Sequence, residues 1–570
     1  MEIPASAHRS FGRRPGQVRW AVLSLVAAAV ISIPVIVVLS FVFAPASDVW
    51  IHLVDTVLVH YITNTAILVV GVGVGTFLMG VGAAWLVTMC RFPGQKTFEW
   101  ALFLPMAVPA YVLAYTYTGM LDFAGPVQTL LRDFFGWSRA DYWFPDVRTI
   151  GGAIIMLVLV LYPYVYLLAR AAFLEQSVCV IEVSRTLGCS PWQSFRRVAL
   201  PLARPALATG VALAVMETLG DFGTVQYFAV DTFTTGIFRT WFGLGDPAAA
   251  AQLAAMLLIF VFIALYAERR SRGAARFHHT STRYRPLQPF QLTGRKAALA
   301  CGACGLPVFF GFLLPAGQLS VWAVDTAAET LNRDFVELTL NTVMVAGLAA
   351  VIAVFVALCL GYGLRLGSTP VVRGATRVAS MGYAVPGSVV AVGVLLPFAW
   401  IDNTIDGWMR DSMGISTGLL LSGTLVALIF AYLVRFLAVS FNTVEASLAN
   451  ITPNMDRAAR SLGKTPLQTV LRVHVPIMWG SLLTAGMLVF VDVMKELPAT
   501  LIMRPFNFNT LAVRAFELAS DERLAESSGP ALAIVAVGIL PVIVLSLAIS
   551  RSRPGYSSEV AANSLKRGSS

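Results

Sequence analysis

Long runs of apolar residues, separated by short polar stretches, dominate this chain. A helix needs about 20 apolar residues to cross a bilayer, and about twelve of the runs reach that length. The pattern therefore predicts an all-α polytopic membrane protein with about 12 transmembrane helices. We expect the spans near 19–44, 64–90, 99–119, 150–174, 205–229, 247–267, 297–324, 340–364, 378–400, 417–440, 479–503 and 529–550.

Two of the polar stretches are copies of each other. The first runs from Glu182 to Pro201 and the second from Arg457 to Pro476. At a shift of 275 positions their Arg, Leu, Gly, Pro, Gln, Arg, Val and final Pro coincide without a gap. A topology-setting basic loop would explain one such stretch, but it explains two matched copies poorly.

Each copy predicts a short helix, a glycine break, a second short helix and a stop at the final proline. Ser190 and Thr465 suit the N-cap of the second helix, and proline suits its first position. Gly188 and Gly463 allow a reversal that a residue with a side chain would resist. We therefore expect two compact elbows that project from the membrane on the cytoplasmic side.

The repeat extends beyond the elbows. Asn64-Thr65 corresponds to Asn341-Thr342, Ala107-Val-Pro109 to Ala384-Val-Pro386, and the Arg239 region to the Arg514 region. Six spans in each copy bring both halves in from the same side, which predicts two parallel six-helix repeats with a pathway at their seam. The expected parts are a cytoplasmic tail (1–18), a first transmembrane domain (19–267), a basic cytoplasmic linker (268–296), a second transmembrane domain (297–550) and a second cytoplasmic tail (551–570).

Composition and charge agree with this topology. The chain is 57% hydrophobic and 13% charged, with a mean hydropathy of +0.74. With both termini in the cytoplasm, most Lys and Arg lie on the inner side, as membrane proteins prefer. The net charge of +10 follows from that bias and requires no nucleic-acid partner. The Cys301-x-x-Cys304 pair lies within an expected span and is interpreted as small packing residues.

Acidic residues in the fifth and eleventh spans are candidates for a translocation pathway. Glu217 and Asp221 are four residues apart and would share a helix face. Asp492 and Glu496 repeat the pair, with Lys495 beside them. A charge near the bilayer centre costs roughly 2.5–3.5 kcal/mol, so a wet or paired environment is required. A conduit for a cation satisfies that requirement, and the four carboxylates would then make transient contact with ferric iron. Neutralisation by Lys495 or a neighbouring span satisfies it as well.

Arg239 and Arg514 occupy equivalent positions just outside the membrane. Either residue would serve to bind an acidic docking partner or to cap a span. Both remain outer-face docking candidates.

The paired elbows resemble the cytoplasmic EAA loops of binding-protein-dependent ABC importer permeases. Relative to that motif, the first copy has Val183 and Ser184 for two alanines, and the second has Arg457 in place of the glutamate. The resemblance implies that a short helix in each loop couples to an ATPase subunit. The coupling residues it implies are Glu182, Arg185, Gly188, Pro191, Pro201, Asp456, Arg460, Gly463, Pro466 and Pro476.

The stretches that begin at Gly220, Val230 and Lys495 more narrowly resemble fused ferric-iron importer permeases. This resemblance implies a bacterial inner-membrane protein that works with a periplasmic ferric-iron-binding protein and a homodimeric ABC ATPase. The chain itself has no Walker-type phosphate loop, so it is expected to be no enzyme and to hold no cofactor, with ATP-Mg on the partner. Membrane lipid is the remaining expected partner.

Other functions fit part of the pattern. Thiamine, phosphonate and polyamine importers share the plan and would differ in the binding protein. A secondary transporter driven by an ion gradient would use the acidic pairs as a relay but has no need of matched elbows. An intramembrane enzyme ranks last, because no HExxH motif and no nucleophile–base pair stands out.

Overall fold

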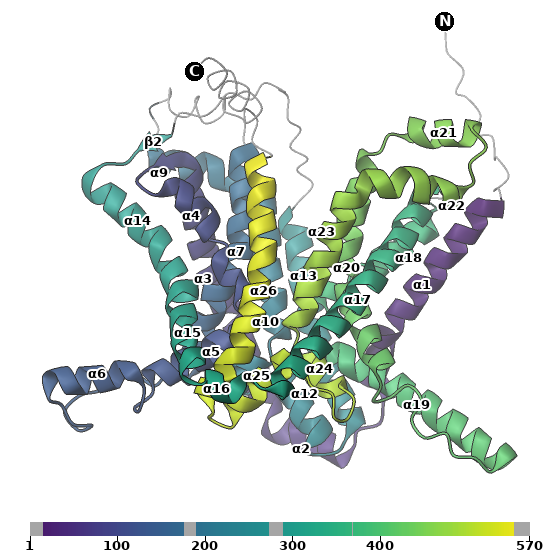
Figure 1. The fold of residues 1–570 in the computed structure, drawn as a ribbon, viewed down its shortest axis with the longest axis horizontal. Helices are drawn as coiled ribbons and strands as arrows, with labels where there is room; N and C mark the ends of the chain where they lie inside the picture. Colours follow the sequence, from purple (N-terminus) through teal and green to yellow (C-terminus); the bar gives the residue numbers. More distant parts are fainter. Residues whose placement is uncertain (1–14, 176–187, 189, 273–288, 367–368, 552–570) are drawn as a thin grey trace, which may run out of the picture. The chain divides into compact units, whose positions relative to one another are not determined.

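The computed structural model describes residues 15–175, 188, 190–272, 289–366 and 369–551, and these are almost entirely helical (Figure 1). Within those residues, eleven helices are long and apolar enough to cross a membrane. A twelfth candidate is the pair Gln95–Ala107 and Ala110–Phe135, which is bent by 90°. The predicted all-α polytopic class with about twelve spans is confirmed.

The helices of the first sequence half are α1 (Pro15–Ser40), α2 (Asp48–Thr56), α3 (Leu58–Met89), α4 (Gln95–Ala101), α5 (Ala110–Leu121), α6 (Pro126–Phe135), α7 (Ile150–Glu175), α9 (Pro191–Ser194), α10 (Leu200–Gly220), α11 (Gly223–Tyr227), α12 (Phe233–Phe242) and α13 (Pro247–Arg272).

Those of the second half are α14 (Gly294–Val308), α15 (Leu314–Asp325), α16 (Ala327–Thr330), α17 (Arg333–Leu366), α18 (Pro370–Ala379), α19 (Gly387–Met413), α20 (Leu425–Asn450), α21 (Pro453–Ser461), α22 (Pro466–Thr469), α23 (Val475–Met494), α24 (Pro498–Met503), α25 (Leu511–Ser520) and α26 (Leu524–Arg551).

Short elements complete the fold. Among the described residues, the 3₁₀ turns are η1 (Phe41–Phe43), η2 (Leu104–Ala107) and η5 (Gly382–Ala384), and the π turns are η3 (Phe195–Ala199), η4 (Phe309–Leu313) and η6 (Val470–His474). Strands β1 (Cys90–Arg91) and β2 (Phe290–Gln291) pair in parallel.

Two of the expected spans end earlier than the hydropathy pattern indicated. The fifth was expected to reach residue 229, but α10 ends at Gly220 and a separate helix, α11, follows. The eleventh was expected to reach residue 503, but α23 ends at Met494 and α24 begins at Pro498. The hydropathy pattern merged each pair because both pieces are apolar and only two or three residues separate them.

The chain packs into two compact units that do not coincide with the two sequence halves. Unit 1 comprises residues 15–36 of α1 together with 345–383 and 429–493, and unit 2 comprises the other described residues. In unit 1 the Trp20 ring of α1 meets the Tyr362 ring of α17 edge-on, with centroids 5.0 Å apart. The first helix of the chain therefore packs against helices of the second half.

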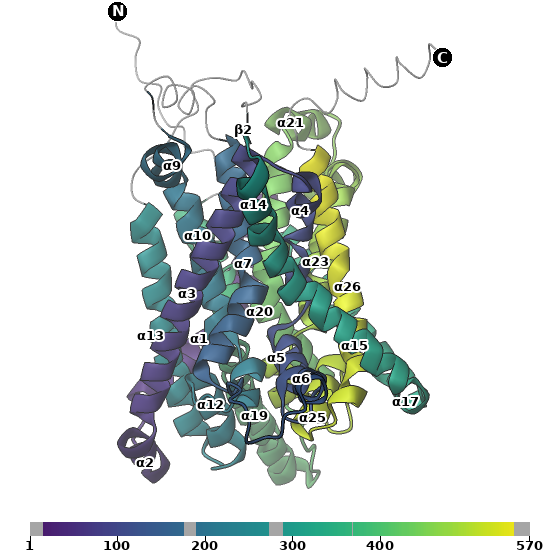
Figure 2. The same cartoon turned by 90° about the vertical axis from the view of Figure 1, so that its left-hand side faces the viewer.

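Unit 2 contains the converse arrangement. The first helices of the second half, α14 and α15, lie along helices of the first half (Figure 2). Tyr117 of α5 donates a hydrogen bond to the Phe310 carbonyl at 2.6 Å, and the Cys301 thiol of α14 lies 3.2 Å from the Pro93 carbonyl oxygen. It stays a prediction that the linker at 268–296 divides the two transmembrane domains.

Glycines allow the central helices of unit 2 to approach closely. A Cβ at Gly80 of α3 would lie 2.8 Å from Val165 Cβ, and one at Gly210 of α10 would lie 2.9 Å from Val165 Cα. Val165 of α7 is fully buried between them. Small residues at helix crossings are the usual basis of close packing in membranes, where lipid supplies little hydrophobic driving force. The α3–α7–α10 bundle is therefore the rigid frame from which α10 leads to the candidate pathway.

Candidate functional site

The second elbow has the geometry that its sequence predicts. Helix α21 ends at Ser461, Gly463 adopts a left-handed conformation with φ of 74°, and α22 begins at Pro466 (Figure 1). Thr465 caps α22, because its hydroxyl accepts a hydrogen bond from the Gln468 amide while the Gln468 side chain accepts one from the Thr465 amide. This reciprocal capping box sets the start of the helix.

The first elbow repeats this geometry where the structure describes it. Gly188 has φ of 78°, and α9 begins at Pro191. Ser190 and Gln193 form the same capping box, with N···O distances of 3.3 and 2.9 Å. The predicted Glu182 and Arg185 lie outside the described residues. The capping boxes explain why both copies carry Gln after the Ser-Pro or Thr-Pro pair.

The expected stop at the final prolines is wrong. The chain continues as a helix from α9 through η3 into α10, and from α22 through η6 into α23. A π turn precedes Pro201 in the first copy and Pro476 in the second. Proline has no amide hydrogen and its ring crowds the preceding turn of a regular α-helix. A π turn adds one residue at that point, so each elbow passes into its membrane span without a break.

The candidate pathway acids are also arranged differently from the expectation. Glu217 lies within α10, but Asp221 follows the end of that helix with ψ of 132° and does not share a helical face with it. The Asp221 carboxylate accepts hydrogen bonds from the Val225 amide at 3.1 Å and the Thr224 hydroxyl at 2.9 Å. It therefore caps the start of α11.

Glu496 performs the same task in the second half. It follows α23, which carries Asp492 but ends at Met494. Its carboxylate accepts the Ala499 amide and the Thr500 amide, both at 3.0 Å, and the Thr500 hydroxyl at 2.8 Å. Glu496 is buried, and its negative charge stabilises the amide-rich start of α24.

The carboxylates do not assemble into a metal centre in the described part of the chain. No group of three or more His, Cys, Asp and Glu side chains there is arranged to hold a metal ion. Asp492 belongs to unit 1, whereas Glu217, Asp221, Lys495 and Glu496 belong to unit 2. Contact of these side chains with cargo stays a proposal.

Tyr111, Gly223 and Leu497 bring the two capped helices of unit 2 together. A Cβ on Gly223, the first residue of α11, would lie 2.6 Å from Tyr111 Cβ and 2.8 Å from Leu497 Cδ2. Leu497 directly follows Glu496, so the starts of α5, α11 and α24 converge here. The Tyr111 hydroxyl is buried without a hydrogen-bond partner among the described residues and lies within electrostatic range of Glu496. No pattern in the sequence signals this convergence.

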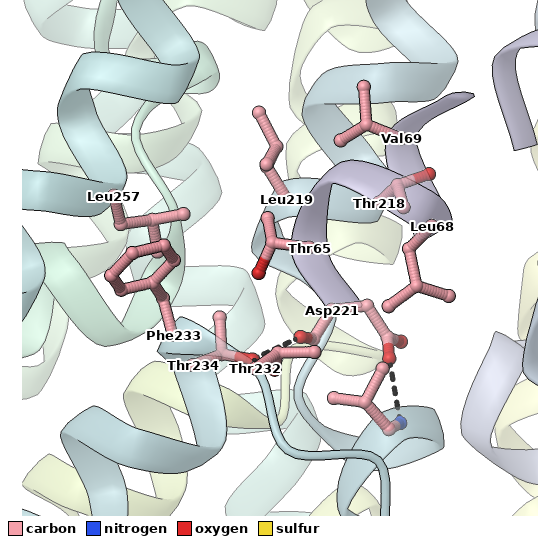
Figure 3. Close-up of a pocket in the computed structure, with 11 residues that line it drawn as sticks. Thr65, Leu68, Val69, Thr218, Leu219, Asp221, Thr232, Phe233, Thr234 and Leu257 are labelled. Atoms are coloured by element: carbon pink, nitrogen blue, oxygen red, sulfur yellow. Dashed lines mark hydrogen bonds between the residues drawn. The ribbon is translucent and has the colours of Figure 1, made fainter. Parts of the chain in front are cut away.

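A small pocket opens beside Asp221 (Figure 3). Its polar wall consists of Asp221 and threonine side chains, and the buried Thr65 hydroxyl there has no hydrogen-bond partner among the described residues. Thr234 donates to the Asp221 carbonyl at 2.7 Å, which fixes the opposite wall. The space suits about one water molecule. The residues that line it are Thr65, Leu68, Val69, Thr218, Leu219, Asp221, Val225, Thr232, Phe233, Thr234 and Leu257.

The two outer arginines have carboxylate partners within the chain. Arg239 of α12 forms an exposed ion pair with Asp231 at 2.9 Å. Arg514 of α25 lies 3.9 Å from Glu517, which Arg504 binds more closely at 2.8 Å. The Arg239 side chain remains 53% exposed, so its pairing leaves it accessible to solvent.

Comparison with known proteins relates part of the chain to a transport family. Residues 76–270, which include the first elbow, match the family described as binding-protein-dependent transport system inner membrane component. The chain carries a domain of this transport family and resembles permeases along most of its length. This class is that of ABC importers, which use a periplasmic binding protein and an ATPase partner. As a permease with these apolar helices, it is a multi-pass inner-membrane protein.

Relatives that match most of the chain are named as iron permeases. The Fe(3+)-transport system permease protein FbpB 2 of Haemophilus influenzae is 27% identical over 85% of this chain and 89% of its own length. The ferric transport system permease protein FbpB of Actinobacillus pleuropneumoniae is 25% identical over 81% of this chain and 67% of its own. The molybdenum transport system permease protein ModB of Escherichia coli is 28% identical but covers only 34% of this permease and 87% of itself. This permease is thus built like two such chains joined, and its relatives are transport proteins rather than enzymes.

Proposed function

We propose that this permease moves ferric iron, delivered by a periplasmic binding protein, across the inner membrane at the expense of ATP. The observation that carries the proposal is similarity along most of the chain to permeases named for ferric transport. The molybdenum and sulfate permeases match only 27–34% of the chain.

The side chains near the candidate pathway suit a hard cation. Ferric iron prefers oxygen ligands such as carboxylate and phenol groups. Asp221, Glu496 and Tyr111 supply such groups close to the junction of α5, α11 and α24. A carboxylate has about four lone-pair sites, so capping leaves Asp221 acceptor capacity for a passing ligand.

The elbows supply the attachment points for the energy source. ATP binding closes a separate ATPase dimer, which draws the two elbows together, and the membrane helices respond by alternating access. Two elbows with matching glycine breaks and capping boxes fit a homodimeric ATPase with two equivalent sockets. ATP-Mg belongs on that partner, and both termini and both elbows belong on the cytoplasmic side. Fusions of residues 1 and 570 to a reporter that is active only in the cytoplasm test this orientation. Both fusions should be active.

Exchange of the cargo tests the assignment. Proteoliposomes with the permease, its ATPase and its binding protein are offered ferric iron, thiamine, a phosphonate or spermidine, each with ATP. Selective uptake of ferric iron is expected. Selective uptake of another cargo would transfer the proposal to that cargo, and uptake driven by an ion gradient without ATP would replace the importer by a secondary transporter.

A further inference from the structure

The end of α17 in unit 1 carries a buried polar cluster that reaches the second elbow. Arg365 Nε lies 2.8 Å from Asp456 Oδ2, and only 15% of either side chain is exposed. On its other oxygen, Asp456 lies 2.7 Å from Nε2 of the fully buried His474. A carboxylate held by arginine accepts hydrogen bonds, so His474 carries its proton on Nε2.

Arg365 also holds the end of α20. Its guanidinium donates to the Leu448 carbonyl at 2.5 Å and to the Ile451 carbonyl at 2.8 Å. The last carbonyls of a helix have no partner within the helix, and a positive charge there matches the helix dipole. One arginine therefore joins the end of α20 to Asp456 in the first turn of α21.

His474 completes the connection to the membrane span. It ends the π turn η6, through which α22 passes into α23. Tyr362, one turn before Arg365, donates to the carbonyl of Pro466 at 3.2 Å, and its ring lies 5.5 Å from that of His474. The cluster thus ties both arms of the elbow to α17.

The described part of the first elbow is held by different chemistry. The positions that correspond to Arg365, Tyr362 and His474 carry Thr88, Trp85 and Ala199, and Ile181 corresponds to Asp456. Instead, the Trp85 ring packs 4.9 Å from Phe195 and 5.7 Å from Phe173. Aromatic packing is less directional than a charged hydrogen-bond network, so the described contacts of the first elbow are of a different kind from those at Arg365.

We propose that Arg365, Asp456 and His474 form an internal latch that fixes the angle of the second elbow, so that α21 moves with α17 and α23 when the ATPase acts. Asp456 is then a positioning residue whose carboxylate is used inside the permease rather than as a contact for the ATPase. The coupling part of this inference rests on the proposed function, because it requires the ATPase partner.

The test compares Asp456→Asn with Glu445→Gln, which removes one exposed carboxylate from α20 in the same unit. Hydrogen exchange of residues 453–461 is measured on the full chain in nanodiscs. The amide of Asp456→Asn keeps the size of the carboxylate but removes the charge between Arg365 and His474. We expect exchange about tenfold faster or more in Asp456→Asn, no change in Glu445→Gln, and a smaller effect in His474→Gln, which retains an N–H donor. If Asp456→Asn does not fold, His474→Gln carries the test, with His474→Leu for comparison.

The second readout is cargo moved per ATP hydrolysed in proteoliposomes. The latch predicts a several-fold lower ratio in Asp456→Asn than in wild type and Glu445→Gln, whereas a fold defect alone would lower uptake and ATP hydrolysis together and leave their ratio unchanged. Unchanged exchange, or faster exchange with an unchanged ratio, overturns the proposal. The exchange measurement needs neither ATPase nor iron, so a permease for another cargo would fail iron uptake and still show the latch.

Discussion

Asp221 and Glu496 lie 275 positions apart, and each accepts the amide hydrogens at the start of a short helix that follows a membrane span. The sequence repeat is therefore a repeat of the capping arrangement at this site. Each carboxylate also accepts a threonine hydroxyl, from Thr224 three residues after Asp221 and from Thr500 four residues after Glu496. This relationship gives the acidic residues a structural task, and a role in cargo transfer would be additional to it.

Loss of charge at these caps should cost stability. In Glu496→Gln and Asp221→Asn the side chain still accepts hydrogen bonds, but without the negative charge that matches the amide-rich helix start. We expect the free energy of unfolding to fall by about 1–3 kcal/mol in each variant. Thermal unfolding in detergent checks this, with Glu445→Gln as the control. A variant as stable as wild type would contradict the capping role.

Proline at the elbow glycines should uncouple transport. Proline fixes φ near −65°, whereas Gly188 and Gly463 have φ of 78° and 74°. We expect Gly188→Pro and Gly463→Pro to reach the membrane in normal amounts but to lose coupling to ATP hydrolysis by roughly tenfold. Binding-protein-stimulated ATPase activity is the measurement, and Gly480→Ala, at an open helical position, is the control. Normal uptake in both proline variants would refute the elbows as coupling elements.

A methyl group at Gly223 should disturb the junction of α5, α11 and α24. The added Cβ would lie 2.6 Å from Tyr111 Cβ, which is closer than side-chain atoms pack. We expect Gly223→Ala to lower the free energy of unfolding by about 1–3 kcal/mol and to reduce uptake. Gly317→Ala of α15 meets nothing within 4 Å and should do neither. Wild-type stability and uptake in Gly223→Ala would show that the junction tolerates expansion.

The exposed ion pair of Arg239 should matter for docking more than for folding. Exposed pairs contribute less than about 1 kcal/mol, so Arg239→Gln and Asp231→Asn should unfold at nearly the wild-type temperature. If Arg239 binds an acidic partner, Arg239→Gln should weaken stimulation by the binding protein, most clearly at low salt where charges are least screened. Stimulation equal to that of wild type at every salt concentration would remove Arg239 from the docking surface.

The sequence predicted the features that depend on composition and local turn chemistry. Apolar length located the spans, and Gly463 and Thr465 predicted the reversal and the cap of the second elbow. It did not predict the π turns before Pro201 and Pro476, because a proline alone also fits a helix stop. It missed Arg365, since nothing local marks an arginine at the end of α17 as a partner of Asp456, 91 positions later. Packing of α1 against second-half helices is likewise a tertiary choice with no local signal.

The most direct test of the central claim is the uptake of radioactive ferric iron into proteoliposomes. The proteoliposomes hold the permease and its ATPase, and the binding protein and ATP are supplied. The account predicts uptake that requires both ATP and the binding protein and that falls in Asp221→Asn and Glu496→Gln. Stimulated ATP hydrolysis without any movement of iron, in wild-type permease loaded with its own binding protein, would contradict ferric iron as the cargo.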